Sequence, residues 1–309
     1  MVLGGGGAHW LKNTVGVNVV MAGFSRTVST AFHFAADLKR IGFLAAFYAL
    51  FVAAVAAVLL SSGKRVIESI AALNVLGAAG GILSLVAGAF VVAAVFFLAN
   101  LVVTGALVHN AGALAGGRPC GLRQSIGAAW KKSASLLGVF AITVAITVAV
   151  GVVAAFFSAV FAFFPPAFLA WEATVLVAGI TLHLALLFAN YEVMLFGKGA
   201  VEAVAASARF FADNVAGTVT VFLISVVAMA ACWAGYFVLL VFSTAALLAS
   251  SVVGKGAAAG WALAVLGIAF AAALFCFSLL FQNGLYAAFL TTAQGTKGIK
   301  RSRSPKNKG

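Results

Sequence analysis

The stretch LFANYEVMLFGKGAVEAVAASARFFADNVAGTVTVF, from Leu187 to Phe222, holds the end of an apolar segment, a short amphipathic segment and the start of a second apolar segment. The same order recurs over residues 98–150, where LANLVVTGALVHN precedes LRQSIGAAWKKS and LLGVFAITVAITVAV. Near the N-terminus, the amphipathic residues 26–41 pass directly into the apolar run Gly42 to Leu60. Three occurrences predict three related hairpins of apolar helices.

The composition assigns the chain to the membrane. Hydrophobic residues make up 64% of its 309 residues and charged residues 8%. Apolar runs longer than the ~18 residues that mark a candidate span recur along the chain. We therefore predict an all-α integral membrane protein.

Six spans follow from these runs, and the basic residues orient them. Sixteen of the nineteen Lys and Arg residues fall on the side that holds both termini, whereas Lys64, Arg65 and Lys255 fall on the other side. By the positive-inside rule, both termini of this cell-membrane protein are predicted to be cytoplasmic. The predicted spans are Ile41 to Leu60, Gly80 to Leu107, Leu136 to Phe163, Ala167 to Tyr191, Val215 to Leu240 and Gly260 to Leu285.

The domain organisation follows from the spans. We expect an uncleaved N-terminal segment over residues 1–25, a transmembrane domain over 26–296 and a basic cytoplasmic tail over 297–309. Within the domain, the repeat units are predicted at about 26–115, 116–198 and 199–296. The outer loops are predicted at Ser61 to Ala79, Phe164 to Pro166 and Ala249 to Ala259, the second one tight because proline ends a helix.

A charged helical face recurs before spans one, three and five. In the third instance Val201, Val204 and Ala208 share one stripe, while Glu202 and Arg209 lie opposite. Such spacing is typical of a helix that lies in the headgroup plane. The alternative is that these segments are only the cytoplasmic ends of long spans.

Three of the nine asparagines, Asn100, Asn190 and Asn283, lie within apolar spans, one on each even-numbered span near its inner end. An unpaired amide in hydrocarbon costs several kcal/mol, so we expect each to point into the bundle. Either the amides tie neighbouring helices together or they line a polar path. Gln282, beside Asn283, is a further polar candidate.

His183 is the most deeply placed ionisable residue of the predicted spans and shares a helical face with Asn190. A proton relay or gate is one interpretation of an intramembrane histidine, and a neutral imidazole bonded between helices is the other. Glu192 lies about 180° around the same helix, so we do not expect it to pair directly with His183.

Signatures of catalysis and of cofactor binding are absent from the sequence. It contains no HExxH, GxSxG or Walker motif, and Cys120, Cys232 and Cys276 have no metal-binding spacing. We expect no enzyme activity, no metal and no cofactor.

The tail KGIKRSRSPKNKG, from Lys297 to Gly309, contains six cations. Each cation near anionic lipid contributes about 1 kcal/mol to membrane attachment. We expect Lys297, Lys300, Arg301 and Arg303 to contact anionic lipid at the cytoplasmic face. An acidic partner protein is the alternative, and nucleic acid is not expected because no aromatic residues are interleaved.

Two segments resemble a known group of proteins. They are GLRQSIGAAWKKSASLLG, at Gly121 to Gly138, and the segment from Asn190 to Ser207, which includes GKGAVEAVAAS. They look like the prokaryotic multi-pass proteins related to the membrane domain of glycerophosphoryl diester phosphodiesterases. The resemblance implies a membrane architecture without the hydrolase domain, and it carries over no site residues.

Two functions fit these patterns. The first is transport or handling of a small or lipid-like molecule without ion coupling, because no acidic residue is predicted near the membrane midplane. The second is a structural or assembly subunit that packs against other membrane chains or against copies of itself, which short loops and Gly and Ala faces favour.

Overall fold

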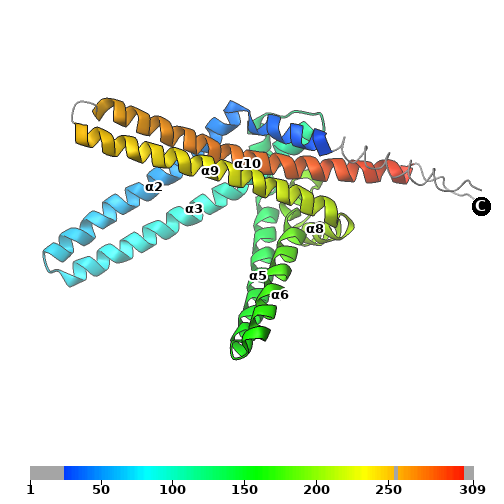
Figure 1. Cartoon of the computed structure of the whole chain (residues 1–309), viewed down its shortest axis with the longest axis horizontal. Coiled ribbons are helices and arrows are strands. Elements are labelled where there is room, and N and C mark those ends of the chain that lie inside the picture. Colours follow the sequence, from blue (N-terminus) through cyan, green and yellow to red (C-terminus); the bar gives the residue numbers. More distant parts are fainter. Residues whose placement is uncertain (1–23, 254–256, 303–309) are drawn as a thin grey trace, which may run out of the picture. The chain divides into compact units, whose positions relative to one another are not determined.

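The computed structural model describes residues 24–253 and 257–302, and within these ranges all regular structure is helical (Figure 1). Residues 24–35 are helical, and the subsequent helices are labelled as in Figure 1. Their bounds are α2 Leu38–Ala71, α3 Val75–Ala115, α4 Leu122–Lys131, α5 Ser133–Phe161, α6 Pro165–Leu186, α7 Ala189–Phe196, α8 Ala200–Asp213, α9 Val215–Val253 and α10 Ala257–Ser302.

Six segments are long and apolar enough to cross a membrane. Each overlaps one predicted span, so the prediction of a multi-pass membrane protein with six apolar helices is confirmed. The segments are Leu38–Ala71, Val75–Ala115, Ser133–Phe161, Pro165–Phe196, Val215–Ala245 and Ala264–Gln294.

The connection between α2 and α3 differs from the prediction of an outer loop from Ser61 to Ala79. Helix α2 continues to Ala71, and the turn takes only residues 72–74. Two features explain the extension. The polar residues Lys64 and Glu68 are good helix formers that form an ion pair at 3.7 Å, and Asn74 starts α3 by accepting a bond from the Gly77 amide at 2.9 Å.

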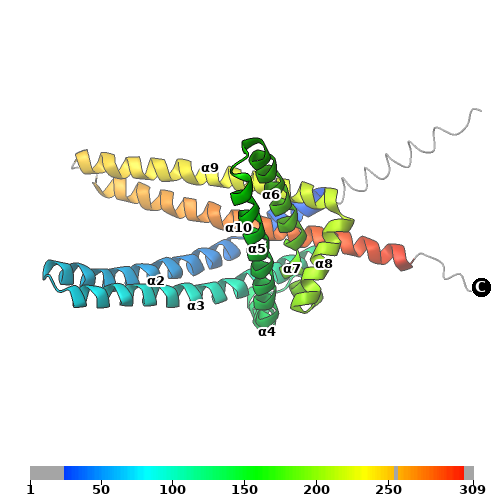
Figure 2. The same cartoon turned by 90° about the horizontal axis from the view of Figure 1, so that it is seen from below.

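The second connection is tight, as predicted, but it takes residues 162–164, because Pro165 and Pro166 begin the following helix and do not form the turn. Helix α5 ends at Phe161, and α6 begins at Pro165, which occupies the first helical position where a missing N–H is tolerated. In Figures 1 and 2, α5 and α6 run side by side as a hairpin.

The chain divides into two compact units. The first contains residues 1–35, 105–231 and 278–309, and the second contains residues 36–104 and 232–277. Helices α3, α9 and α10 contribute segments to both units. The units are defined by spatial contacts, and the three predicted repeat units stay a prediction.

In the first unit, the core forms around Phe188, whose side chain is fully buried. Its ring packs against those of Phe210 and Tyr286 at centroid distances of 5.0 and 5.9 Å. Gly284 allows α10 and the helix at residues 24–35 to approach each other closely, because a Cβ at this position would lie 3.1 Å from the Cα of Ala31.

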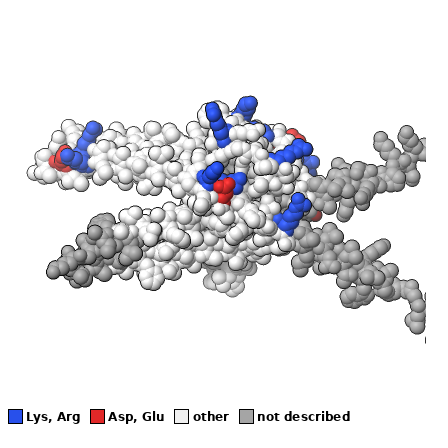
Figure 3. All heavy atoms as spheres, turned by 90° about the horizontal axis from the view of Figure 1, so that it is seen from above, with Lys and Arg blue, Asp and Glu red and all other residues white. Residues whose placement is uncertain are grey.

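In the second unit, aromatic rings join the α2/α3 hairpin to the neighbouring segments of α9 and α10. Tyr48 contacts Phe96 and Phe275 at 5.8 and 5.5 Å, and Trp233 contacts Phe275 at 6.0 Å. Between Arg40 and Lys64 helix α2 carries no charge, and α3 carries no Lys, Arg, Asp or Glu along its length, which leaves the long uncharged surface visible in Figure 3.

Candidate functional site

An open apolar pocket lies between α5 and α6 and has a volume of about 310 Å³. That volume is at the lower end of the range for small-molecule sites. We call it the α5/α6 groove, and its lining residues are Ala149, Val150, Val153, Ala154, Trp171, Thr174, Val175 and Ala178. The one hydroxyl in this set belongs to Thr174 and donates to the Ala170 carbonyl at 2.8 Å. The groove therefore offers a ligand almost only hydrocarbon.

A polar trio, Ser158, Trp171 and Glu172, lies beside the end of the groove nearest the hairpin turn. The Trp171 indole donates to the Ser158 hydroxyl at 3.1 Å and to the Ala154 carbonyl at 3.3 Å. Ser158 donates in turn to the Glu172 carboxylate at 2.6 Å. Ala154 lies seven residues before the end of α5, which is about 10 Å along the helix axis.

The fourth span is broken between α6 and α7, close to the predicted inner end. Ser207 of α8 inserts its hydroxyl there, accepting a bond from the Phe188 amide at 3.1 Å and donating to the Ala185 carbonyl at 2.7 Å. Ser207 is fully buried. The side chain thus satisfies two of the backbone groups that a helix break leaves without partners.

Helix α7 ends in a turn that several groups stabilise. Gly197 has a φ of 71°, the left-handed conformation that favours glycine at this position. The Lys132 ammonium donates to the carbonyls of Val193 and Met194 at 3.0 and 3.1 Å. A cation at a helix C-terminus is favourable, although burial lowers the pKa of Lys132.

Beside this turn lie three residues that we call the Glu192 cluster, namely Glu192, Lys198 and Gln294. Glu192 is only 1% exposed. Its carboxylate forms an ion pair with Lys198 at 2.9 Å and accepts a bond from the Gln294 amide at 2.9 Å. A buried carboxylate requires such partners, since desolvation of an unpaired charge is very costly. The burial of Glu192 was not expected from the sequence.

Two of the three predicted intramembrane asparagines accept a bond from a tyrosine. The Tyr48 hydroxyl donates to Asn100 at 3.4 Å in the second unit. The Tyr191 hydroxyl donates to Asn283 at 3.1 Å in the first unit, where the Asn283 amide also donates to the Leu279 carbonyl at 2.8 Å. The two tyrosine bonds join different helices and are the kind expected of amides that tie helices together.

The other predicted polar residues are placed separately. The carbonyl oxygen of the Asn190 side chain is buried and has no hydrogen-bond partner in the described part of the chain. His183 is exposed, and its ring centroid lies 5.9 Å from that of Phe222. Gln282 is half-buried. Of the predicted lipid-contacting residues in the tail, Lys297, Lys300 and Arg301 lie within α10, and Arg303 lies outside the described residues.

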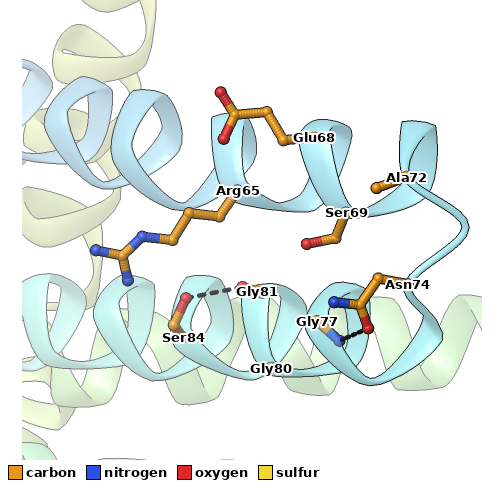
Figure 4. Close-up of a pocket in the computed structure, with 9 residues that line it drawn as sticks. All are labelled: Arg65, Glu68, Ser69, Ala72, Asn74, Gly77, Gly80, Gly81 and Ser84. Atoms are coloured by element: carbon orange, nitrogen blue, oxygen red, sulfur yellow. Dashed lines mark hydrogen bonds between the residues drawn. The ribbon is translucent and has the colours of Figure 1, made fainter.

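A second pocket, of about 400 Å³, lies at the tip of the α2/α3 hairpin (Figure 4). Its lining includes Arg65 and Glu68 of α2 on one side, and Asn74 with the glycines of α3 on the other. In Figure 4 the Glu68 side chain points away from α3, whereas the Arg65 side chain reaches toward it. This lining contains charged and polar side chains, so its chemistry differs from that of the α5/α6 groove.

Comparisons with known proteins found no family model, no curated protein and no solved structure that matches the chain. The likeness of the segments Gly121 to Gly138 and Asn190 to Ser207 to phosphodiesterase-related membrane domains therefore stays an expectation about architecture.

Proposed function

We propose that this multi-pass membrane protein takes up a lipid-like molecule in the α5/α6 groove and handles it without ion coupling. The observation that carries the proposal is the lining of the groove, which is apolar and open, on a hairpin of two spanning helices. A groove on such a hairpin faces acyl chains when the hairpin crosses the bilayer.

The polar trio supports a lipid over a plain hydrocarbon. Ser158 lies one helical turn nearer the hairpin turn than Ala154, so a headgroup or ester would reach Ser158 and Glu172 while its chain lies in the groove. Trp171 links the two regions and has the amphipathic ring preferred at a membrane interface.

The Glu192 cluster supports the absence of ion coupling. Coupled transporters use an intramembrane carboxylate that exchanges a proton or a cation with solvent. Glu192 instead has a fixed counter-charge 2.9 Å away in Lys198, and Glu172 accepts a bond from Ser158. Both acidic residues of the fourth span thus have partners within the protein.

We also propose that both termini are cytoplasmic and that three hairpins repeat, each preceded by an interfacial helix. Helical residues 24–35, α4 and α8 precede spans one, three and five. In α8 the residues buried against the protein include Ala203 and Phe210, whereas Val201 of the predicted stripe is 74% exposed. Trp130 of α4 is 70% exposed. Exposed apolar residues at these positions support contact with the headgroup region.

Filling the groove tests the proposal. Ala154→Phe places a ring in the groove, and Ala155→Phe, at the adjacent position outside the lining, is the matched control. We expect a photoactivatable phospholipid, added to the full chain in nanodiscs, to label peptides of α5 and α6 in the native protein and in the control. The Ala154→Phe variant should lose most of that labelling. Equal labelling of the two variants would contradict a lipid site in the groove.

An assembly subunit is the second candidate, and one observation favours it. In the most apolar 18-residue stretch of α2, 6% of the residues are buried, and in that of α3 none is buried. Surfaces so little covered by their own chain are available to other membrane chains or to further copies of this one. Native mass spectrometry after extraction in mild detergent separates the candidates: stoichiometric companions support the subunit, and a lone chain with bound lipid supports the groove.

A further inference from the structure

Four polar residues meet where α3 leads into α4. We call them the Cys120 cluster, and its members are His109, Asn110, Cys120 and Ser125. The Cys120 sulfur lies 3.1 Å from the Ser125 hydroxyl, 3.5 Å from the Asn110 amide nitrogen and 3.7 Å from Nδ1 of His109. The structure thus places a thiol, an imidazole and two donor groups within contact of one another.

Buried residues hold this arrangement in place. Ser125 is fully buried and Asn110 is 2% exposed. The Asn110 amide donates to the Cys120 carbonyl at 2.6 Å and to the Ser125 hydroxyl at 3.3 Å. Cys120 itself is only half-buried, so this residue, unlike Ser125 and Asn110, is in contact with solvent.

The surroundings of Cys120 set it apart from the other two cysteines. Cys120 immediately precedes Gly121, the N-cap of α4, where backbone amides favour negative charge. Arg118 and Arg123 flank it and are exposed, and no Asp or Glu occurs between residues 69 and 171. Cys276 is 1% exposed. Cys232 lies within the span Val215–Ala245.

We propose that Cys120 is a reactive thiol that undergoes exchange with small anionic disulfides, with His109 as its proton acceptor. With the ring proton on Nε2, Nδ1 of His109 takes the thiol proton, and the thiolate attacks one sulfur of the disulfide. The S–S bond of the reagent breaks, a mixed disulfide forms on Cys120, and the second half of the reagent leaves as a thiolate. Cys120 is oxidised and the disulfide is reduced. A nucleophilic cysteine with an adjacent imidazole is the arrangement that this reaction requires.

The flanking arginines specify the charge of the reagent. Arg118 and Arg123 would attract a disulfide that carries carboxylates, and they would have little effect on a neutral one. The site is therefore a modification site for low-molecular-weight acidic disulfides, on the side of the membrane that holds α4. It is independent of the α5/α6 groove and of the lipid proposal.

The test uses the full chain in nanodiscs with Cys232→Ser and Cys276→Ser, so that Cys120 is the only thiol. The reference replaces all three cysteines by Ser and adds Leu73→Cys, because Leu73 is 90% exposed and lies in a turn outside this cluster. The dianionic disulfide DTNB is the probe, and release of its coloured thiolate gives the rate. We expect Cys120 to react at least about tenfold faster than the reference thiol.

Two variants separate catalysis from mere accessibility. His109→Ala should lower the rate to that of the reference, and added imidazole should restore much of it, which a purely structural role would not allow. Arg118→Gln with Arg123→Gln should slow DTNB and leave the neutral dipyridyl disulfide unchanged. A Cys120 rate no faster than the reference, or a rate that His109→Ala does not change, would overturn the proposal.

Discussion

The hydroxyl of Ser207, in α8, accepts a hydrogen bond of 3.1 Å from the backbone amide of Phe188, which lies between α6 and α7. The same hydroxyl donates to the Ala185 carbonyl at 2.7 Å. One side chain of α8 therefore keeps the fourth span broken between α6 and α7. The break positions Asn190, Tyr191 and Glu192, because all three lie in the short helix that follows it.

Ser207→Ala should destabilise the protein by about 1 to 3 kcal/mol, because it leaves a buried donor and a buried acceptor without a partner. The matched control is Thr220→Ala, since Thr220 is exposed and its hydroxyl bonds only within its own helix. Unfolding of both variants in mild detergent, followed by circular dichroism, checks the expectation. An unchanged midpoint for Ser207→Ala would mean that this hydroxyl does not support the break.

The ion pair between Glu192 and Lys198 predicts an asymmetry between two substitutions. Lys198→Met leaves a carboxylate that is 1% exposed without its counter-charge and should cost about 3 kcal/mol of stability. Glu192→Gln leaves the Lys198 ammonium without its carboxylate partner. Because the Lys198 side chain is 27% exposed, this change should cost only about 1 kcal/mol of stability. The double variant should be more stable than Lys198→Met alone.

An exposed pair provides the control for that experiment. Lys64 and Glu68 are 77% and 63% exposed, and Lys64→Met should change the stability by less than about 0.5 kcal/mol. Equal costs for Lys198→Met and Lys64→Met would show that the Glu192 carboxylate reaches solvent.

The features that the sequence predicted correctly are those that depend on local composition. Six apolar segments coincide with six candidate spans because length and hydropathy alone define them. The α5/α6 turn was predictable because Pro165 restricts the backbone wherever it occurs. The turn after α2 was not, because the apolar run ends at Leu60, although Lys64 and Glu68 beyond it form helix readily.

Periodicity cannot relate the residues that form the polar contacts. Glu192 meets Gln294, which lies 102 residues further along the chain, and Cys120 meets His109 across the turn that follows α3. In α8, the residues that bury against the protein are offset from the predicted stripe, because the helix has a second apolar face. For the Glu192 cluster, Gly197 was an available sequence signal, because a glycine there predicts a helix end. The turn at that helix end brings Lys198 back toward Glu192.

Lys132 should make stability depend on pH. Burial lowers its pKa from the ordinary value of 10.5. Between the lowered pKa and 10.5, the unfolded chain holds more protons than the folded one, so the free energy of unfolding rises with pH. Below the lowered pKa, the cost of burying the charged ammonium is present in full. We expect the free energy of unfolding of the native protein to rise relative to that of Lys132→Met as pH approaches 10.5. A pH-independent difference, measured by thermal unfolding, would argue against this desolvation.

The proposed topology predicts opposite labelling of two exposed positions. Leu73 is 90% exposed at the turn between α2 and α3, and Arg118 is exposed in the turn between α3 and α4. Helix α3 joins these turns and contains 41 residues, or about 60 Å of helix, which is ample to cross the bilayer. Ser62 is a poor reporter for the outer side, because it is 8% exposed and bonds to Ser84. With the native cysteines replaced by Ser, Leu73→Cys should react with a membrane-impermeant maleimide in intact cells. Arg118→Cys should react only after the cells are opened, and labelling of both positions from one side would refute the topology.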